Sequence, residues 1–231
     1  MVLEVKDVSK EFGEGTTRVR ALKEVSFTIK RGEFVLIVGT SGSGKSTLLN
    51  LIGLLDNPTS GKIILDGKDT TNLSDNQRSQ VRNNKIGFIF QFSNLLPDLS
   101  ILENVTLPRY IQGRNNRAVS DSKNFLDLVD LSDQLEKRAN KVSGGQAQRA
   151  AIARGLVNNP SIILADEPTG NLDSVTAYKI VHLMKSMCKK LNQTFLVVTH
   201  DREQFTDPDR VITIKDGIAS EDDVLSMEIQ K

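Results

Sequence analysis

The glycine-rich loop at residues 39–47 constrains this sequence more strongly than any other stretch. An apolar run at residues 34–38 precedes it and is typical of a buried strand, and an apolar-rich segment at residues 48–52 follows it and is typical of a helix. The loop consists of Gly39, Thr40, Ser41, Gly42, Ser43, Gly44, Lys45, Ser46 and Thr47. This spacing matches G-x-x-x-x-G-K-[ST], which between a strand and a helix predicts a phosphate-binding loop.

Each position in the loop has a physical role. The glycines let the backbone curl so that several N–H groups converge on one phosphate, at a helix N-terminus whose dipole favours negative charge. Lys45 would reach the outer phosphates, and Ser46 would bind magnesium. A flexible turn between a strand and a helix needs no lysine at this spacing, so we interpret the stretch as a nucleotide phosphate site.

Composition and charge argue against several classes of protein. A chain of 231 residues can form one large domain or a core with a small subdomain. Its formal net charge of +1 gives no whole-chain reason to bind nucleic acid or an anionic membrane. No apolar run approaches the roughly 18 residues that a membrane helix requires, and the single cysteine, Cys188, rules out an intrachain disulfide. We therefore expect a cytoplasmic protein that reaches a membrane only through a partner.

Two segments near the N-terminus alternate apolar and polar residues with the period of half-buried strands. They cover residues 3–8 and 25–29, and a glycine-containing loop is predicted to begin between them at Phe12. An aromatic ring in such a loop could stack on a nucleotide base, or it could anchor the loop on its own subdomain. The sequence around Phe12 supports both readings equally.

The composition changes after residue 95, where prolines, a polar loop and apolar residues at helical spacing replace the strand pattern. We interpret this region as a helical subdomain inserted into the core, with grooves that could receive a protein partner. It leads to the stretch Ser143-Gly144-Gly145-Gln146.

The stretch at residues 143–146 has two interpretations. Ser143 and Gln146 have the S-x-x-Q spacing of a capping box at a helix start. Two glycines in the first turn each cost roughly 1 kcal/mol relative to alanine, which a simple cap would avoid. Because bare backbone at a helix N-terminus binds anions, we expect a second phosphate-facing element, serving a nucleotide held by another copy.

Polar residues at or just after three other apolar runs are candidate site residues. Gln91 follows the run at residues 86–90 and could present its amide to a metal or a water. Asp166 ends the next such run and would be a magnesium-side acid, and Glu167 could accept a proton from an attacking water. His200 follows the run at residues 195–198, and strand C-termini form the ligand crevice of open parallel sheets.

In this order, the motifs resemble those of an ABC-type ATPase, the nucleotide-binding subunit of a membrane transporter. The resemblance covers nearly the whole chain, and the Ser-Gly-Gly-Gln stretch is its most specific part, since other nucleotidases share the phosphate loop. Residues 92–97 and 102–108 are similar to the subgroup serving lipoprotein release and macrolide export. Val142 departs from the usual leucine of the family, and Ala147 stands where this subgroup often has glutamine.

The resemblance implies an α/β fold in one domain over residues 1–231. Its P-loop NTPase core would contain a mainly parallel sheet, accompanied by an N-terminal antiparallel β subdomain and an inserted helical subdomain. The antiparallel subdomain would take residues 1–33 and 60–70, the core residues 34–59, 71–94 and 158–231, and the helical subdomain residues 95–157.

The resemblance also implies the roles of individual residues. Phe12 would stack on adenine, and residues 39–47 would wrap the phosphates of ATP. Ser46 and Gln91 would hold Mg²⁺, with Asp166 supporting it through water, and Glu167 would be the general base. The expected catalytic residues are Glu167, His200, Lys45 and Gln91. Ser143, Gly144, Gly145 and Gln146 would close over ATP bound by a second copy, with Asp173 at the interface.

The expected function is ATP hydrolysis by a dimer that drives integral membrane permease subunits from the cytoplasmic face of the membrane. No nucleic acid is expected as a partner. The main alternative is a soluble ABC-type ATPase of translation or DNA maintenance, although such relatives usually carry two cassettes or long coiled coils. A regulatory module that senses ATP without hydrolysing it is a weaker alternative, and steady-state phosphate release would separate it from an ATPase.

Overall fold

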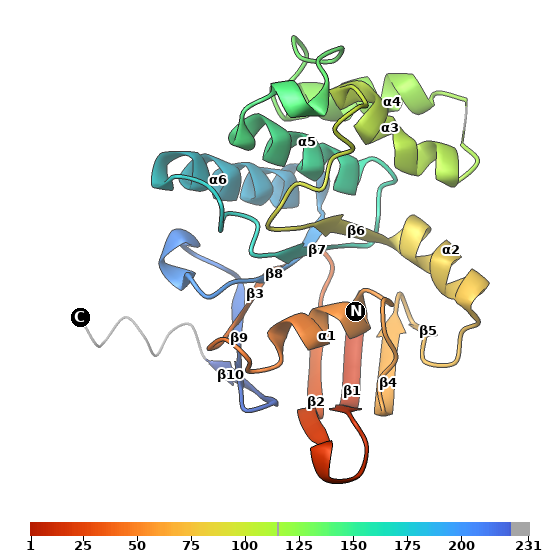
Figure 1. Ribbon diagram of the computed structural model, residues 1–231, viewed down its shortest axis with the longest axis vertical. Helices are drawn as coiled ribbons and strands as arrows, with labels where there is room; N and C mark the ends of the chain where they lie inside the picture. The colour runs from red at the N-terminus through yellow and green to blue at the C-terminus, as the bar shows by residue number, and fades with distance from the viewer. Residues whose placement is uncertain (115, 223–231) are drawn as a thin grey trace.

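A six-stranded sheet runs through the centre of the structure, a computed structural model that describes residues 1–114 and 116–222 (Figure 1). The strand order is β10-β9-β3-β8-β7-β6, and β10 alone is antiparallel to its neighbour. The strands are β3 (Phe34–Val38), β6 (Ile86–Ile89), β7 (Ile162–Asp166), β8 (Thr194–Val198), β9 (Arg210–Lys215) and β10 (Ile218–Asp222). Central parallel strands are buried on both faces, which explains their unbroken apolar runs.

A second, antiparallel sheet lies on one side of the first, with the order β2-β1-β4-β5 (Figure 1). Its strands are β1 (Leu3–Phe12), β2 (Val19–Ile29), β4 (Ser60–Leu65) and β5 (Lys68–Asp69), and the 3₁₀ turn η1 (Gly15–Thr17) joins the first two. Helix α1 (Lys45–Ile52) packs between the sheets. Apolar residues from both sheets and α1 form one continuous core.

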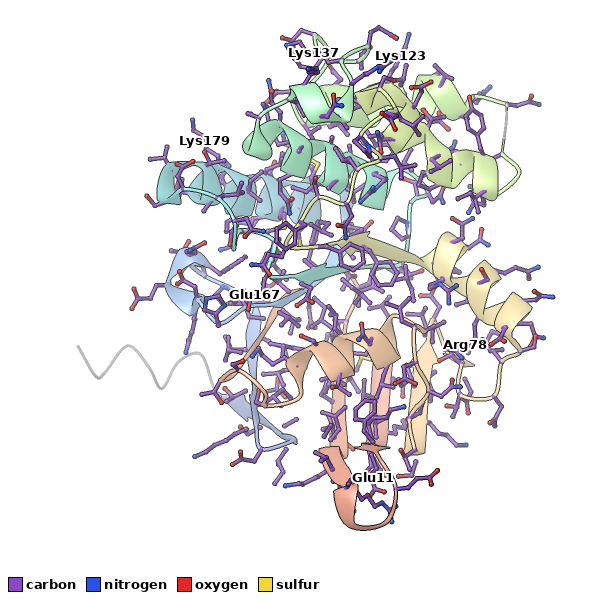
Figure 2. All side chains as sticks on the ribbon, in the orientation of Figure 1. Glu11, Arg78, Lys123, Lys137, Glu167 and Lys179 are labelled. Atoms are coloured by element: carbon purple, nitrogen blue, oxygen red, sulfur yellow. The ribbon has the colours of Figure 1, made fainter. Side chains whose placement is uncertain are left out.

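Helices cover the opposite face of the central sheet. Helices α5 (Gly144–Leu156) and α6 (Ser174–Leu191) pack directly on it, and α3 (Ile101–Ile111) and α4 (Ala118–Leu128) lie over α5 (Figure 1). Helix α2 (Asp75–Lys85) lies at the edge beside β6, and η2 (Ala139–Lys141) and η3 (Arg202–Gln204) are short turns. Figure 2 shows Lys123 and Lys137 of the helical layer at the end of the molecule opposite Glu11 of β1.

Local side-chain caps fix where several helices begin. Ser74, Ser100 and Ser143 each start a helix through a capping box with Gln77, Glu103 and Gln146, respectively. Each serine oxygen accepts from the N3 backbone N–H and each N3 side chain returns to the serine N–H, so two otherwise unpaired donors are satisfied. The capping box at Ser143 is therefore confirmed.

The observed elements confirm the predicted α/β fold with its mainly parallel sheet, antiparallel sheet and inserted helices. The strand predicted at residues 34–38 has those bounds as β3. The prediction that Phe12 lies in a loop is wrong, because antiparallel pairing to Val19 extends β1 to include it. The end of the predicted core range, beyond residue 222, lies outside the described residues. None of the helices in the described part of the chain has the length and hydropathy needed to cross a bilayer.

Replacing Phe195 by alanine should test the packing of the helix-covered face. Phe195 is fully buried, and its ring stacks on Phe34 with centroids 5.6 Å apart. We expect Phe195→Ala to lower the free energy of unfolding by about 3–5 kcal/mol, measured by chemical denaturation. The control is Phe92→Ala, which removes a ring that is 68% exposed and should change the same quantity by less than about 0.5 kcal/mol. Equal effects of the two substitutions would contradict the core assignment.

Candidate functional site

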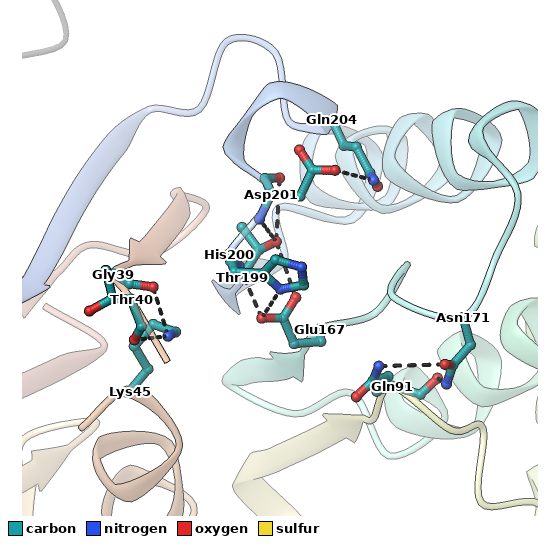
Figure 3. Close-up of polar contacts among 10 residues, drawn as sticks. All are labelled: Gly39, Thr40, Lys45, Gln91, Glu167, Asn171, Thr199, His200, Asp201 and Gln204. Carbon is teal, nitrogen blue, oxygen red and sulfur yellow. Dashed lines mark hydrogen bonds and ion pairs between the residues drawn. The ribbon is translucent and has the colours of Figure 1, made fainter. Parts of the chain in front are cut away.

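The phosphate-binding loop connects β3 to α1 and holds its lysine inside the turn. Gly44 precedes α1 with φ 110°, and a Cβ there would lie 2.7 Å from the carbonyl oxygen of Ala21, so only glycine fits. Lys45 is buried, and its Nζ donates to the carbonyl oxygens of Gly39 at 2.8 Å and Thr40 at 2.9 Å (Figure 3). The hydroxyl-bearing Ser46 is exposed at the first turn of α1. Because the N–H groups of this first turn lack helical partners, the loop is suited to bind an anion.

Two acidic residues leave the sheet beside this loop. Asp166 is the last residue of β7, and burial together with the neighbouring Glu167 charge raises its pKa, against the opposing effect of Lys45. Glu167 has φ 47°, a left-handed conformation that is uncommon for a residue other than glycine. Its backbone N–H donates to the Val198 carbonyl at 2.9 Å, which ties this turn to the end of β8. This turn places Glu167 directly after the end of β7.

The carboxylate of Glu167 is held by the segment after β8 (Figure 3). Its Oε1 accepts from the His200 backbone N–H at 2.9 Å and lies 2.8 Å from His200 Nδ1. Its Oε2 accepts from the Thr199 hydroxyl at 3.3 Å. The side chain of Glu167 is mostly shielded while that of His200 is mostly exposed, so the pair presents the histidine ring outward.

A cavity of about 300 Å³ brings several of the predicted residues together. It is lined by the phosphate loop, the first turn of α1, Ala21 of β2, Glu167 and His200. The cavity lies at the carboxyl edge of the parallel strands, where ligands bind in open α/β sheets. The predicted convergence of the loop with Glu167 and His200 at this edge is observed.

Gln91 lies near this edge without lining the cavity. Its Nε2 is 3.5 Å from Asn171 Oδ1, and Asn171 Nδ2 donates to the Gln91 carbonyl at 3.1 Å (Figure 3). Phe12 is also outside the lining, 46% exposed, with Lys10 Nζ 5.0 Å from its ring centroid. The stacking of Phe12 on a base stays a prediction.

The stretch at residues 143–146 faces a different part of the surface. It starts α5 and lines a groove of about 690 Å³ along α6, with Thr176, Lys179 and His182. Figure 2 shows Lys179 on α6, apart from Glu167 at the sheet edge. The prediction of a phosphate-facing element separate from the first site is consistent with this placement.

The two glycines of this stretch are not equivalent. A Cβ at Gly145 would lie 2.7 Å from the Thr176 methyl, so close packing of α5 on α6 accounts for that glycine. A Cβ at Gly144 would meet only the Leu172 side chain, at 3.6 Å, which is ordinary contact. Packing therefore explains Gly145, and Gly144 has no such requirement.

Asp173 is engaged in capping α6. Its Oδ1 accepts from the Thr176 N–H at 3.0 Å, and hydrogen bonding to Thr176 lowers the pKa of the exposed Asp173 carboxyl. Three side chains that contact site residues or their immediate neighbours were not predicted: Thr199, Asn171 and Gln148. Thr199 directly precedes His200, so its place at a strand end was a usable signal. Gln148 and Asn171 have no pattern in the sequence that reveals their partners.

Comparison with known proteins identifies relatives over nearly the whole chain. The family model described as ABC transporter matches residues 22–170. The lipoprotein-releasing system ATP-binding protein LolD of Shewanella denitrificans is 45% identical over 221 residues, covering 95% of each chain. The macrolide export ATP-binding/permease protein MacB of Aggregatibacter actinomycetemcomitans is 44% identical over 217 residues, covering 94% of this chain and 34% of MacB.

A solved structure shares the fold as well as the sequence similarity. The dimeric, post-hydrolysis state of the ATP-binding cassette MJ0796 bound to ADP and Pi superposes with a TM-score of 0.86 at 43% identity, covering 96% of this chain and 98% of that one.

Replacing Asp166 by asparagine should stabilise the protein at neutral pH. Because the pKa of Asp166 is raised in the folded protein, protonation of Asp166 stabilises the fold at pH values below 3.8, its ordinary pKa. This stabilisation is lost as the pH rises through the raised pKa. At pH 7 the carboxylate of Asp166 is ionised, and its partial burial next to Glu167 therefore lowers the free energy of unfolding. We expect Asp166→Asn to raise the Tm at pH 7 by about 2 °C, with the gain shrinking as the pH falls toward 3.8.

The matched control for this measurement is Asp173→Asn, because hydrogen bonding lowers the pKa of Asp173. Ionised Asp173 adds stability above its ordinary pKa of 3.8, so the same substitution there should not raise the Tm at pH 7. A fall in Tm for Asp166→Asn at pH 7 would contradict the charge repulsion inferred between Asp166 and Glu167.

Proposed function

Because this chain belongs to the ABC transporter family, we propose that it is the ATP-binding and ATP-hydrolysing subunit of a transporter, two copies of which close around two ATP molecules to drive a separate membrane permease. One observation carries the proposal. The phosphate loop, Glu167 and His200 line one cavity, while Ser143 and Gly144 are exposed at a helix start that lines another groove.

The phosphate loop binds the triphosphate through its backbone and Lys45. The N–H groups at the start of α1 donate to phosphate oxygens, and the helix dipole favours their negative charge. Because Lys45 Nζ donates to the carbonyl oxygens of Gly39 and Thr40, its charge already lies inside the loop. When ATP binds, Nζ exchanges these carbonyl oxygens for phosphate oxygens. Phe12, exposed at the end of β1, stacks on adenine.

Mg²⁺ fits the residues around this loop. Ser46, Gln91 and Asp166 offer hydroxyl, amide and carboxylate oxygens, the donors that this cation prefers, and Mg²⁺ usually completes its coordination with substrate phosphates and water. Ser46 and Gln91 would hold the ion, and Asp166 would support it through water. Burial and the neighbouring Glu167 charge raise the pKa of Asp166, and a cation beside this carboxylate would offset both effects. When bound, the ion neutralises charge on the phosphates.

Glu167 is the general base for hydrolysis. A water bound between its carboxylate and the terminal phosphate transfers a proton to a Glu167 oxygen as the water oxygen attacks phosphorus and the bond to ADP breaks. The hydrogen bonds from His200 and Thr199 fix that carboxylate in place. The exposed ring of His200 contacts the terminal phosphate.

The second copy supplies the lid. Ser143, Gly144, Gly145 and Gln146 of one copy close over ATP in the phosphate loop of the other, and Asp173 lies at the same interface. ATP drives closure by binding the closed dimer better than the open pair, which is a shift of population between two states. Hydrolysis removes this preference and releases the two copies.

The relatives support a role in transport and give no support to the alternative in translation or DNA maintenance. We place the protein on the cytoplasmic face of a membrane, held there by its permease, with no nucleic-acid partner. Its similarity to LolD and MacB favours a system of the lipoprotein-release or macrolide-export type. We also propose that the chain divides into the three parts predicted from the sequence: the antiparallel subdomain, the core and the helical subdomain at residues 95–157.

The substitution Glu167→Gln tests the proposed dimer and the proposed base together. It removes proton acceptance while keeping a hydrogen-bonding side chain of the same size, so ATP should bind without being hydrolysed. We expect phosphate release to fall at least about 100-fold and a dimer to persist on gel filtration with ATP and Mg²⁺. A monomer under these conditions, with ATP bound, would count against closure around ATP.

The substitution Gly144→Asp tests whether the start of α5 faces a phosphate of the second copy. The position has room for a side chain, and an acidic group in the first turn of a helix is favoured by the dipole, so the Tm should stay the same or rise. The same charge would repel a triphosphate. In the Glu167→Gln background we therefore expect the ATP-dependent dimer to be lost, and its persistence would place this helix start away from the nucleotide.

A further inference from the structure

The amide of Gln148 joins two segments of the hydrolysis site to the helix that starts at Ser143. Gln148 lies in the second turn of α5 and is 3% exposed. Its Nε2 donates to the carbonyl oxygen of Phe90 at 3.0 Å and to that of Pro168 at 2.8 Å. Phe90 directly precedes Gln91, and Pro168 directly follows Glu167. One buried side chain therefore contacts the backbone next to both residues.

Helix α5 is also fixed to the segment around Gln91 by packing and by a second side chain. A Cβ at Gly87 of β6 would lie 2.2 Å from the Gly155 carbonyl oxygen, so helix and strand touch backbone to backbone. Farther along α5, the Arg154 guanidinium donates to the carbonyl oxygens of Ser93 and Asn94, each at 2.6 Å. A shift of α5 must therefore move the segment at residues 90–94 with it.

The link to Glu167 is different, because it runs through a single side chain of α5, whose hydrogen bond from Gln148 Nε2 reaches the Pro168 carbonyl. Glu167 occupies a left-handed turn, and its carboxylate is held by residues that follow β8. Without the Gln148 amide, the Pro168 carbonyl loses its donor from α5. The turn at Glu167 then keeps its hydrogen bond to Val198 and the link from Asn171 to Gln91, but it no longer follows the position of α5.

We propose that Gln148 is a positioning residue, which holds Gln91 and Glu167 at a fixed relative position and transmits the location of the Ser143 end of α5 to both. The role rests on the proposed function, since it concerns the geometry of ATP hydrolysis. Contact of the start of α5 with the second copy's ATP then sets the backbone on either side of the reacting phosphate. A displacement of about 1 Å in such a site can lower a rate by up to about 100-fold.

The test is Gln148→Met, which keeps the length of the side chain and removes both donors. The matched control is Gln193→Met. Gln193 is also a buried amide, and its Nε2 donates to the Pro160 carbonyl at 3.0 Å, but it joins the beginnings of β7 and β8 at the opposite edge of the same sheet. Each variant leaves one buried carbonyl without its donor, that of Pro168 or that of Pro160, and Gln148→Met also leaves the partly buried Phe90 carbonyl. Both variants should therefore lose about 5 °C in Tm, with the larger loss for Gln148→Met.

The two variants should differ in ATP turnover. We expect Gln148→Met to lower kcat at least about tenfold with the KM for ATP changed less than twofold, because the phosphate loop is untouched. Gln193→Met should keep both constants within about twofold. Equal kcat values for the two variants, or a Gln148→Met defect confined to KM, would overturn the role of Gln148.

A further variant, Gln148→Glu, adds a pH readout that also serves if Gln148→Met does not fold. Burial next to two carbonyl oxygens raises the pKa of the introduced carboxyl, which can donate one hydrogen bond only when protonated. Its kcat relative to that of the wild type should rise as the pH is lowered, and a ratio independent of pH would overturn the proposal. Absence of phosphate release by the wild-type protein would overturn the proposed function itself, and the role of Gln148 with it.

Discussion

The parallel pairing of β3, β8, β7 and β6 is the constraint on which the rest of the structure depends. Val198 of β8 is level with Ile37 on one side and with Asp166 on the other. Since parallel strands end at the same edge, this register makes the phosphate loop, the acidic pair and the Thr199-His200 segment leave the sheet at one level. The apolar interior that fixes this register includes the two clusters on either face of the sheet.

The charged side chains at this edge of the sheet are where the arrangement is least favourable for folding. The fold places two carboxylates next to each other beside a buried lysine, and burial together with the Glu167 charge raises the pKa of Asp166. Lys45 meanwhile satisfies its donors on loop carbonyls. Both features are unfavourable or neutral for folding, and both suit a site that receives a polyanion with a divalent cation. Perturbed groups of this kind concentrate at functional sites.

Helix α5 shows how one element serves folding and the proposed function together. Its capping box satisfies the first backbone donors, and Gly145 allows close packing on α6, so the two readings of residues 143–146 are compatible. Farther along, the helix contacts β6 and the residues that flank Gln91 and Glu167. Because α5 is a single helix with its start on the surface and its body packed on β6, it can link the Ser143 stretch to the segments beside Gln91 and Glu167 directly.

The sequence by itself determined the phosphate loop and the identity of the acids, because these depend on local spacing and on apolar runs of strands buried on both faces, and its resemblance to ABC-type ATPases implied the fold class. It also indicated that Glu167 and His200 stand at the ends of strands in the row that carries the phosphate loop, and that Gln91 follows a buried strand. The tertiary structure alone decided the extent of β1 through Phe12, the bonding of Glu167 to Thr199 and His200, and the contacts of Gln148 with Phe90 and Pro168. The four hydrogen bonds of Gln148 and Glu167 join residues between 20 and 58 positions apart, and the extent of β1 depends on strand pairing. Such contacts follow from how elements pack, and no local pattern of residues encodes them.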